Sequence, residues 1–202
     1  MFLETICILR GEVQNLQGHK ARMQRTASHF GFKAPQLPDL PALIQREIQD
    51  NPEKRGDSRI KCRIIYHKII REVSFESYLP KKIASLKLIE ASVDYSFKLA
   101  DRRLLNALLA QKGDCDEILI TRNGIITDTS YSNVVFSQGE QYFTPESPLL
   151  NGTKRQKLLN EGIITEKRID RNSLSEYDHI YLINAMLDIE DGVSLPISNI
   201  VY

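Results

Sequence analysis

Several features that mark common classes of protein are missing from this sequence of 202 residues. It has only three cysteines, at scattered positions 7, 62 and 115. An odd number without close pairs argues against a disulfide framework or a zinc site and is typical of a reducing cytoplasm. The four histidines show no metal-ligand spacing either, so we expect no metal site.

An excess of charge of one sign and a long apolar run are also missing. The net charge of +1 gives no general attraction to nucleic acid or to an anionic membrane. No apolar stretch approaches the roughly 20 residues of a membrane span, and the first residues, with the acidic Glu4, do not form a cleavable signal. The remaining composition, 42% hydrophobic, is that of a globular protein with one domain or two small ones. We therefore expect a cytoplasmic protein.

Hydrophobic periodicity predicts an order of strands and helices along the chain. Strands are expected over residues 2–9, 59–66, 71–78, 86–92, 140–143, 163–168 and 180–183, and helices over residues 19–30, 40–50, 99–112 and 153–160. Asp39 is a candidate N-cap, and residues 51–58 read as a charged turn. The pattern changes near residues 80–85 from antiparallel strands to a mixed order, so we divide the chain into domains 1–83 and 84–202.

Residues 116–136 predict a strand, a tight turn and a second strand that is interrupted by polar residues. Asn123 and Gly124 tolerate the positive φ that a hairpin turn needs. Six polar or amphipathic residues, 128–133, then stand between two apolar runs, which is costly unless they have partners. The run is either a functional site, with Asp128 as its odd carboxylate, or an edge strand facing water, and both alternatives stay open here.

Three further positions carry possible chemistry. Gly152 and Thr153 open a helix, whose N–H groups and dipole would suit an anion, although a plain helix start is the commoner case. Arg22 on the first helix would bind phosphate if buried, whereas exposed arginines are more frequent. Lys98, between two apolar residues at the predicted helix start, could carry an amine of lowered pKa suited to a carbonyl substrate, or simply be solvated.

Six short patterns occur in the order in which the class IV aminotransferases, the pyridoxal-phosphate enzymes of fold type IV, carry them. They are F-L-E-T-I at 2–6, H-x-x-R at 19–22, Lys98 with Asp101 and Arg102, Gly124 with Asp128 and Asn133, T-P-x-x-x-L-L-x-G-x-x-R at 144–155, and Asn184-Ala185. The chain resembles this family over almost its whole length. The resemblance implies an α+β, D-amino-acid-aminotransferase-like fold with a small N-terminal α/β domain and a larger, barrel-like C-terminal domain that bears the lysine. It also implies a homodimer.

The resemblance assigns roles position by position. Lys98 matches the lysine that holds pyridoxal 5'-phosphate covalently and then acts as general acid and base. Asp128 stands where the family usually has a glutamate facing the pyridine nitrogen, one methylene longer, so contact would need a shift or a bridging water. The phosphate would be anchored from two domains, in the cleft between them, by Arg22 and by the backbone of Thr153 and Lys154. Asn133 and Asn184 are further polar contacts by the same resemblance.

Two reactions share this machinery. One is the 4-amino-4-deoxychorismate lyase reaction of folate biosynthesis, which releases pyruvate and 4-aminobenzoate, and the other is transamination of branched-chain or D-amino acids. The pattern at Lys98–Arg102 and the position of Thr5, where lyases often have a threonine able to assist proton transfer, favour the lyase. Arg102, Arg103 and Arg155 are candidates for the substrate carboxylate. Family members usually carry further strands before the F-E-T start, so a non-catalytic cofactor-binding homologue is the third alternative.

Overall fold

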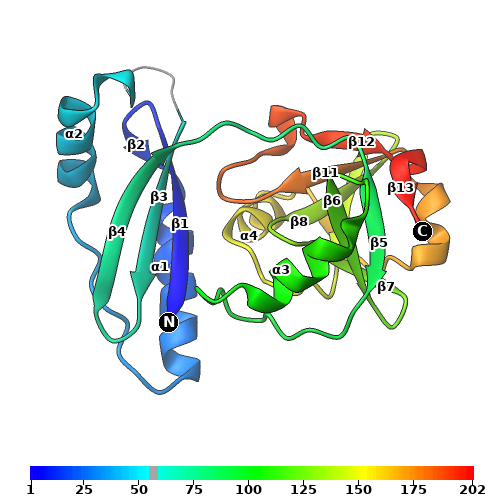
Figure 1. Ribbon diagram of the computed structural model, residues 1–202, viewed down its shortest axis with the longest axis horizontal. Helices are drawn as coiled ribbons and strands as arrows, with labels where there is room; N and C mark the ends of the chain where they lie inside the picture. Colours follow the sequence, from blue (N-terminus) through cyan, green and yellow to red (C-terminus); the bar gives the residue numbers. More distant parts are fainter. Residues whose placement is uncertain (55–58) are drawn as a thin grey trace. The chain divides into compact units, whose positions relative to one another are not determined.

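The computed structural model describes residues 1–54 and 59–202 and divides into two compact units (Figure 1). The first contains Met1–Leu79 together with Phe97–Asp101, and the second contains Pro80–Ser96 and Arg102–Tyr202. The chain first passes from the first unit to the second after Leu79, close to the division expected at residue 83. Residues 97–101, which include Lys98, were expected in the second domain but pack with the first unit. Of the charged turn at 51–58, residues 52–54 form a 3-10 turn and residues 55–58 lie outside the described residues.

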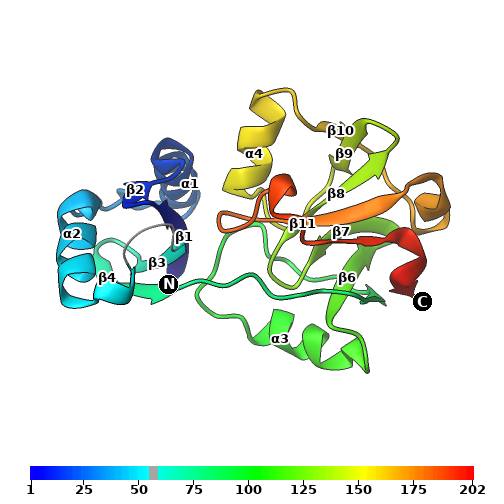
Figure 2. The same cartoon turned by 90° about the horizontal axis from the view of Figure 1, so that it is seen from above.

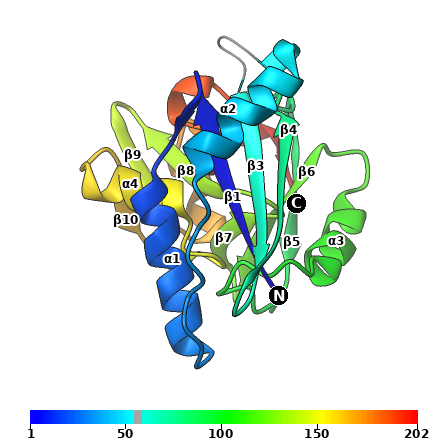
Figure 3. The ribbon, with the colours of Figure 1, turned by 90° about the vertical axis from the view of Figure 1, so that its left-hand side faces the viewer.

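The first unit is a four-stranded antiparallel sheet in the order β2-β1-β3-β4. Its strands are β1 (Phe2–Leu9), β2 (Glu12–Val13), β3 (Arg59–Tyr66) and β4 (Ile70–Ser77). Helices α1 (Leu16–His29) and α2 (Leu40–Asp50) both lie on one face of this sheet, as Figure 3 shows. The predicted N-cap is confirmed, because the Asp39 side chain accepts a hydrogen bond from Ala42 N at 3.1 Å.

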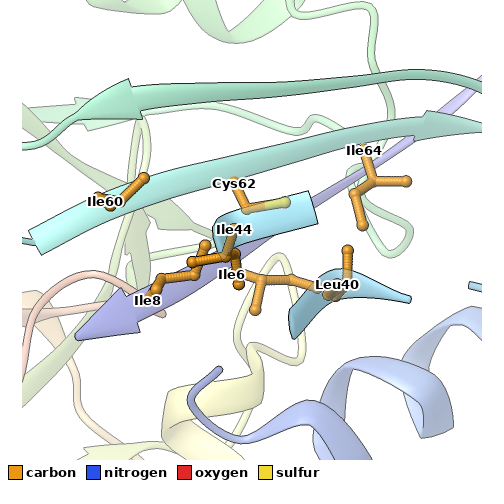
Figure 4. Packing of buried hydrophobic residues seen from close by; sticks show 7 residues of the cluster. All are labelled: Ile6, Ile8, Leu40, Ile44, Ile60, Cys62 and Ile64. Carbon is orange, nitrogen blue, oxygen red and sulfur yellow. The ribbon is translucent and has the colours of Figure 1, made fainter. Parts of the chain in front are cut away.

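The core of this unit forms where alternate residues of β1 and β3 meet α2 (Figure 4). Successive strand residues point to opposite faces, so the even positions of β1 face the helices. The buried residues of this cluster are Ile6, Ile8, Leu40, Ile44, Ile60, Cys62 and Ile64. Each buried aliphatic side chain contributes about 1.5–3 kcal/mol by leaving water. Glu4 lies on the same face of β1, which makes it a carboxylate in an apolar layer.

The segment around Lys98 is extended and lies along β1. Leu3 N donates to Lys98 O at 2.9 Å, Ala100 N donates to Met1 O at 3.1 Å, and Leu99 forms an isolated bridge with Phe2. The prediction of a helix from residue 99 was therefore wrong at its start, since α3 spans Arg103–Leu109 and continues as a 3-10 turn to Lys112. Backbone pairing with β1, a partner nearly 100 residues earlier, overrides the local helical pattern.

The second unit is built on a mixed sheet in the order β10-β9-β8-β7-β6-β5-β13, with β11 beside β8 and β12 beside β11. Figure 2 shows α3 and α4 flanking these strands separately. The bounds are β5 (Leu86–Glu90), β6 (Glu117–Arg122), β7 (Ile125–Thr129), β8 (Asn133–Gln138), β9 (Gln141–Pro145), α4 (Thr153–Asn160), β10 (Thr165–Lys167), β11 (His179–Ile183), β12 (Ser194–Pro196) and β13 (Ile200–Val201). The predicted helix at 153–160 is confirmed.

Two reversals of the chain shape the β6–β8 region. The predicted turn is confirmed, because Asn123 and Gly124 both have positive φ, 52° and 75°. The expected interrupted second strand is instead two strands, since β7 ends at Thr129 and β8 begins at Asn133. The Thr129 hydroxyl accepts from Ser132 N at 3.0 Å and from Tyr131 N at 3.3 Å, which closes the turn. Asp128 and Asn133 consequently stand opposite each other across the pair.

No helix in the described part of the chain is long and apolar enough to cross a membrane. No group of three or more histidine, cysteine, aspartate or glutamate side chains within residues 1–54 and 59–202 is placed to hold a metal ion. The three cysteines, all described, are buried and form no disulfide.

Candidate active site

Glu4 is the centre of a buried polar cluster in the first unit. Its carboxylate is 0% exposed and accepts from Arg22 through both oxygens, at 2.9 Å from Nε and 2.6 Å from an Nη. The second oxygen also lies 2.6 Å from Nδ1 of His19. His19 and Arg22 come from successive turns of α1 on the face that covers β1. The helix thus delivers both groups to one strand residue.

The charges within this cluster follow from burial and pairing. Burial alone would raise the pKa of Glu4, but the Arg22 charge and the hydrogen bonds from His19 and Arg22 outweigh it and lower the pKa to about 2. Burial lowers the pKa of His19 and, together with the nearby positive charges of Arg22 and Lys98, outweighs the hydrogen bond and charge of Glu4, which raise it. An ionised Glu4 can only accept hydrogen bonds, so a neutral His19 carries its proton on Nδ1. The cluster is therefore an anion, a guanidinium and a neutral imidazole.

Lys98 belongs to the same neighbourhood. Its side chain is partly buried, and its backbone carbonyl accepts a hydrogen bond from Leu3 of β1. Its positive charge contributes to lowering the pKa of His19. Thr5 follows Glu4 in β1, so its side chain points to the opposite face of the sheet. Of the site residues predicted in this unit, Lys98 and Arg22 both lie near Glu4. Thr5 lies on the opposite face of the sheet from Arg22.

In the second unit, Asp128 and Asn133 hold the backbone of Leu150. Asp128 Oδ1 accepts from Asn133 Nδ2 at 2.8 Å, and Asp128 Oδ2 accepts from Leu150 N at 2.9 Å. Asn133 Nδ2 also donates to Leu150 O at 2.8 Å. The polar run is therefore a hydrogen-bonded element with partners for its side chains. Burial raises the pKa of Asp128 to about 6, partly offset by the bonds from Leu150 and Asn133.

The loop after Leu150 leads directly into α4. Gly152 is the N-cap, and a Cβ at this position would lie 2.0 Å from Asn133 Oδ1, so the close approach requires glycine. The N-cap provides no side-chain hydrogen bond, and the first turn contains no acidic residue. Thr153 and Lys154 therefore begin a helix whose positive end is not neutralised by its own side chains, a setting suited to an anion.

Lys154 and Asn184 are linked through a neighbouring turn. The Lys154 ammonium forms an ion pair with Asp188, whose other oxygen accepts from Ile189 N at 2.9 Å. Asn184 Oδ1 accepts from Met186 N at 2.8 Å, which fixes the turn between β11 and Asp188. The side chains of both predicted cofactor residues thus have structural partners, and Lys154 is left with its backbone N–H for an anion at α4.

Of the three candidate carboxylate-binding arginines, Arg103 is exposed at the start of α3, and Arg102 and Arg155 differ in their surroundings. Arg102 is partly buried and donates to Ser130 O at 2.8 Å, beside the Asp128–Asn133 turn. Arg155 is 1% exposed and donates to Pro145 O at 2.8 Å and to Glu166 Oε1 at 2.6 Å. These contacts connect Arg155 of α4 to β9 and β10, whereas Arg102 contacts the backbone of the turn between β7 and β8.

Glu4 and His19 are part of the F-L-E-T-I and H-x-x-R patterns, but neither residue was predicted to have a role in the site. The available signal was the glutamate within the otherwise apolar strand 2–9. A carboxylate on the core face of a strand needs a cationic partner, and H-x-x-R on the following helix supplies one.

The chain has clear relatives among known proteins. The model of the family described as amino-transferase class IV matches residues 1–194. A crystal structure of a candidate 4-amino-4-deoxychorismate lyase from Haemophilus somnus 129PT aligns with a TM-score of 0.82 and 36% identity, covering 92% of this chain and 95% of that chain. An uncharacterized protein of Haemophilus influenzae is 39% identical over 185 residues, covering 91% of this chain and 96% of the relative. A candidate aminodeoxychorismate lyase of Schizosaccharomyces pombe is 23% identical over 201 residues, covering 91% and 85%. These matches confirm the predicted family resemblance and the α+β class of fold type IV.

Proposed function

The chain belongs to the amino-transferase class IV family, whose members are pyridoxal-phosphate enzymes, and we propose that it is a 4-amino-4-deoxychorismate lyase. The observation that carries the proposal is the position of Lys98, fixed to β1 beside the Glu4–His19–Arg22 cluster. A primary amine held among buried charged groups is what covalent attachment of the cofactor needs. The name of the Haemophilus somnus relative, at 36% identity, supports the lyase over other members of the family.

Each unit holds residues whose chemistry fits a part of pyridoxal 5'-phosphate. Lys98 supplies the amine for its carbonyl group, and the start of α4, with glycine as N-cap and no acidic residue in its first turn, suits its phosphate. Arg22 supplies a guanidinium that Glu4 holds in a fixed orientation. The bound cofactor supplies an electron-withdrawing ring that stabilises negative charge on the substrate carbon bearing the amino group.

The remaining chemistry falls to side chains of this chain. Lys98 Nζ takes the proton from the carbon that bears the amino group, the bond between the neighbouring ring carbon and the enolpyruvyl oxygen breaks, and the ring becomes aromatic 4-aminobenzoate. The departing enolpyruvate gains a proton at its methylene carbon and becomes pyruvate. The family resemblance alone supports a role for Thr5 in proton transfer to the departing group, because its side chain points to the opposite face of β1 from Glu4. Arg102 is a better candidate than Arg155 for the substrate carboxylate, because Arg155 is buried and already paired with Glu166.

The test begins with cofactor attachment. Purified protein mixed with pyridoxal 5'-phosphate should show a visible absorption band that borohydride removes, with the label on Lys98 by peptide mass spectrometry. Lys98→Ala should show neither, and Lys20→Ala, which removes an exposed lysine of α1, is the matched control. Absence of the band in the wild-type protein would overturn the assignment as a pyridoxal-phosphate enzyme.

The second test separates the two reactions. Aminodeoxychorismate should yield 4-aminobenzoate, measured by fluorescence, and pyruvate, measured by a coupled dehydrogenase assay, in equal amounts. Branched-chain and D-amino acids are offered in parallel with a keto acid. Keto-acid-dependent turnover without 4-aminobenzoate would instead identify an aminotransferase, and cofactor binding without either reaction would identify a non-catalytic homologue.

We further propose a cytoplasmic homodimer. The family resemblance motivates the dimer, and three buried cysteines without a disulfide suit a reducing compartment. Analytical ultracentrifugation of the holoenzyme tests the assembly, and a fully active monomer would contradict it.

A further inference from the structure

The pair Asp128 and Asn133 binds both polar groups of one residue, Leu150. Asp128 accepts from the Leu150 N–H at 2.9 Å, and Asn133 donates to the Leu150 carbonyl at 2.8 Å. The two side chains are joined to each other at 2.8 Å. We call this arrangement, of Asp128, Asn133 and the Leu150 backbone, the Leu150 clamp. It lies three residues before the first residue of α4, on the loop that ends at Gly152.

Gly152 connects the Leu150 clamp directly to the start of α4. Asn133 Oδ1 occupies the space that a side chain at position 152 would need, so the backbone of Gly152 rests against Asn133. Gly152 O in turn accepts from Gln156 N at 3.0 Å, the first hydrogen bond of α4. A shift of Leu150 therefore changes where the N–H groups of Thr153 and Lys154 point.

We infer that Asp128 is a positioning residue for the phosphate group of the cofactor and acts through the Leu150 clamp, rather than on the pyridine ring. The inference rests on the proposed function, because it takes the start of α4 as the phosphate site. It differs from the family role of this position, where a longer glutamate faces the ring nitrogen.

Three observations support this assignment. The Asp128 side chain is only 4% exposed, and each of its oxygens already accepts a hydrogen bond from the clamp. Aspartate is one methylene shorter than glutamate, which keeps the carboxylate close to its own strand, within reach of Leu150. Asn133, the cross-strand neighbour, binds the same backbone residue, so the pair works as one unit.

The test compares two ligands that differ only in phosphate. Dissociation constants for pyridoxal 5'-phosphate and for pyridoxal are measured in Asp128→Asn and Asn133→Ala, with the exposed Glu140→Gln on the β8–β9 turn as control. In Asp128→Asn, the amide offers one acceptor oxygen where the carboxylate offers two, so its NH2 group faces a donor, either Asn133 Nδ2 or the Leu150 N–H, and a hydrogen bond to a charged group is lost. We expect about ten-fold weaker binding of pyridoxal 5'-phosphate in both variants, as one such bond predicts. Pyridoxal affinity and the absorption maximum of the bound cofactor should stay unchanged.

A ring contact by Asp128 would give a different result. Asp128→Asn alone would then weaken both ligands equally and shift the absorption maximum, while Asn133→Ala would leave the spectrum unaltered, and the inference would be overturned. Equal binding of pyridoxal 5'-phosphate by the variants and the wild type would overturn it as well.

Hydrogen exchange separates this inference from the proposed function. The Leu150 and Gln156 amides should exchange faster in Asp128→Asn than in wild type without any cofactor, because their hydrogen bonds depend on the clamp. Unchanged exchange would refute the clamp even if the wild-type protein binds no pyridoxal 5'-phosphate. Absence of binding with accelerated exchange would refute the cofactor role of the clamp together with the proposed function.

Discussion

Replacing Glu4 by glutamine should destabilise the first unit by about 3 kcal/mol at neutral pH. The side chain is 0% exposed, and its pKa is lowered from 4.5 to about 2, so solvent screening is small. At 1.36 kcal/mol for each pKa unit, this difference corresponds to about 3 kcal/mol of stability held by the ionised form. Removal of one partner from a buried ion pair typically costs about 3–5 kcal/mol, and in this variant Arg22 loses its carboxylate partner.

The pH dependence has a definite sign. A carboxylate whose pKa is lowered on folding stabilises the protein above its unfolded pKa, and this stabilisation is lost as the pH falls from about 4.5 to about 2. The difference between wild type and Glu4→Gln should therefore be full at pH 7 and shrink steadily below pH 4.5. Glu72→Gln, on the exposed part of β4, removes a charge from the same sheet and should change the stability by less than about 0.5 kcal/mol.

The assay is amide hydrogen exchange of β1 and β3, combined with urea unfolding followed by circular dichroism. Exchange of these strands reports on the first unit alone, which matters because a chain of two units need not unfold in a single step. A Glu4→Gln protein with wild-type protection in β1 at pH 7, or with a deficit that is the same at pH 7 and pH 3, would refute the reasoning.

Three further predictions concern the proposed site. Lys98→Arg keeps the positive charge but not the nucleophilic amine, so it should retain the thermal stability of the wild type and lose the borohydride-fixed label, as mass spectrometry and calorimetry can check. Gly152→Ala should cost about 1–3 kcal/mol in urea unfolding because its Cβ meets Asn133 Oδ1, and markedly less in the Asn133→Ala background; equal costs in both would contradict the contact. Because burial raises the pKa of Asp128 to about 6 from 3.8, its ionisation should remove about 3 kcal/mol of stability as the pH rises from about 4 to 6. Asp128→Asn should lack this loss, and parallel pH profiles for the two proteins would count against it.

Elements with strong local signals were predictable from the sequence. The alternation of β1 and β3 and the Asp39 cap of α2 gave bounds that agree with the structure. The same is true of α4, where glycine precedes a run of helix-forming residues. In each case the short-range pattern and the tertiary environment favour the same conformation.

Long-range pairing explains the errors. Nothing in the sequence near Lys98 indicates that its backbone will pair with Leu3. The predicted start of α3, at residue 99, therefore lies before its observed start at Arg103. The run from Asp128 to Asn133 was ambiguous for a related reason. A turn closed by Thr129 and a clamp on Leu150, 22 residues beyond Asp128, cannot be inferred from the polarity of the run alone.

The candidate site was predictable mainly through the family resemblance. Local patterns singled out Lys98, Arg22 and the Gly152 turn, but each also had an ordinary explanation. The roles of Glu4 and His19 emerge only when strand and helix meet, because burial and charge pairing are properties of the folded chain.

The path of the chain between its two units limits how the protein can be dissected. The chain passes from one unit to the other at residues 79–80, 96–97 and 101–102. Residues 97–101, which include Lys98, therefore belong to the first unit but are flanked in the sequence by residues of the second. No single cut in the gene yields both units whole. A fragment ending at Leu79 would lack Lys98 and would leave the Leu3 N–H of β1 without its acceptor. Expression of either unit alone therefore requires a redesigned connection. For the first unit, this could be a short linker that joins residue 79 to residues 97–101 and lets them pair with β1.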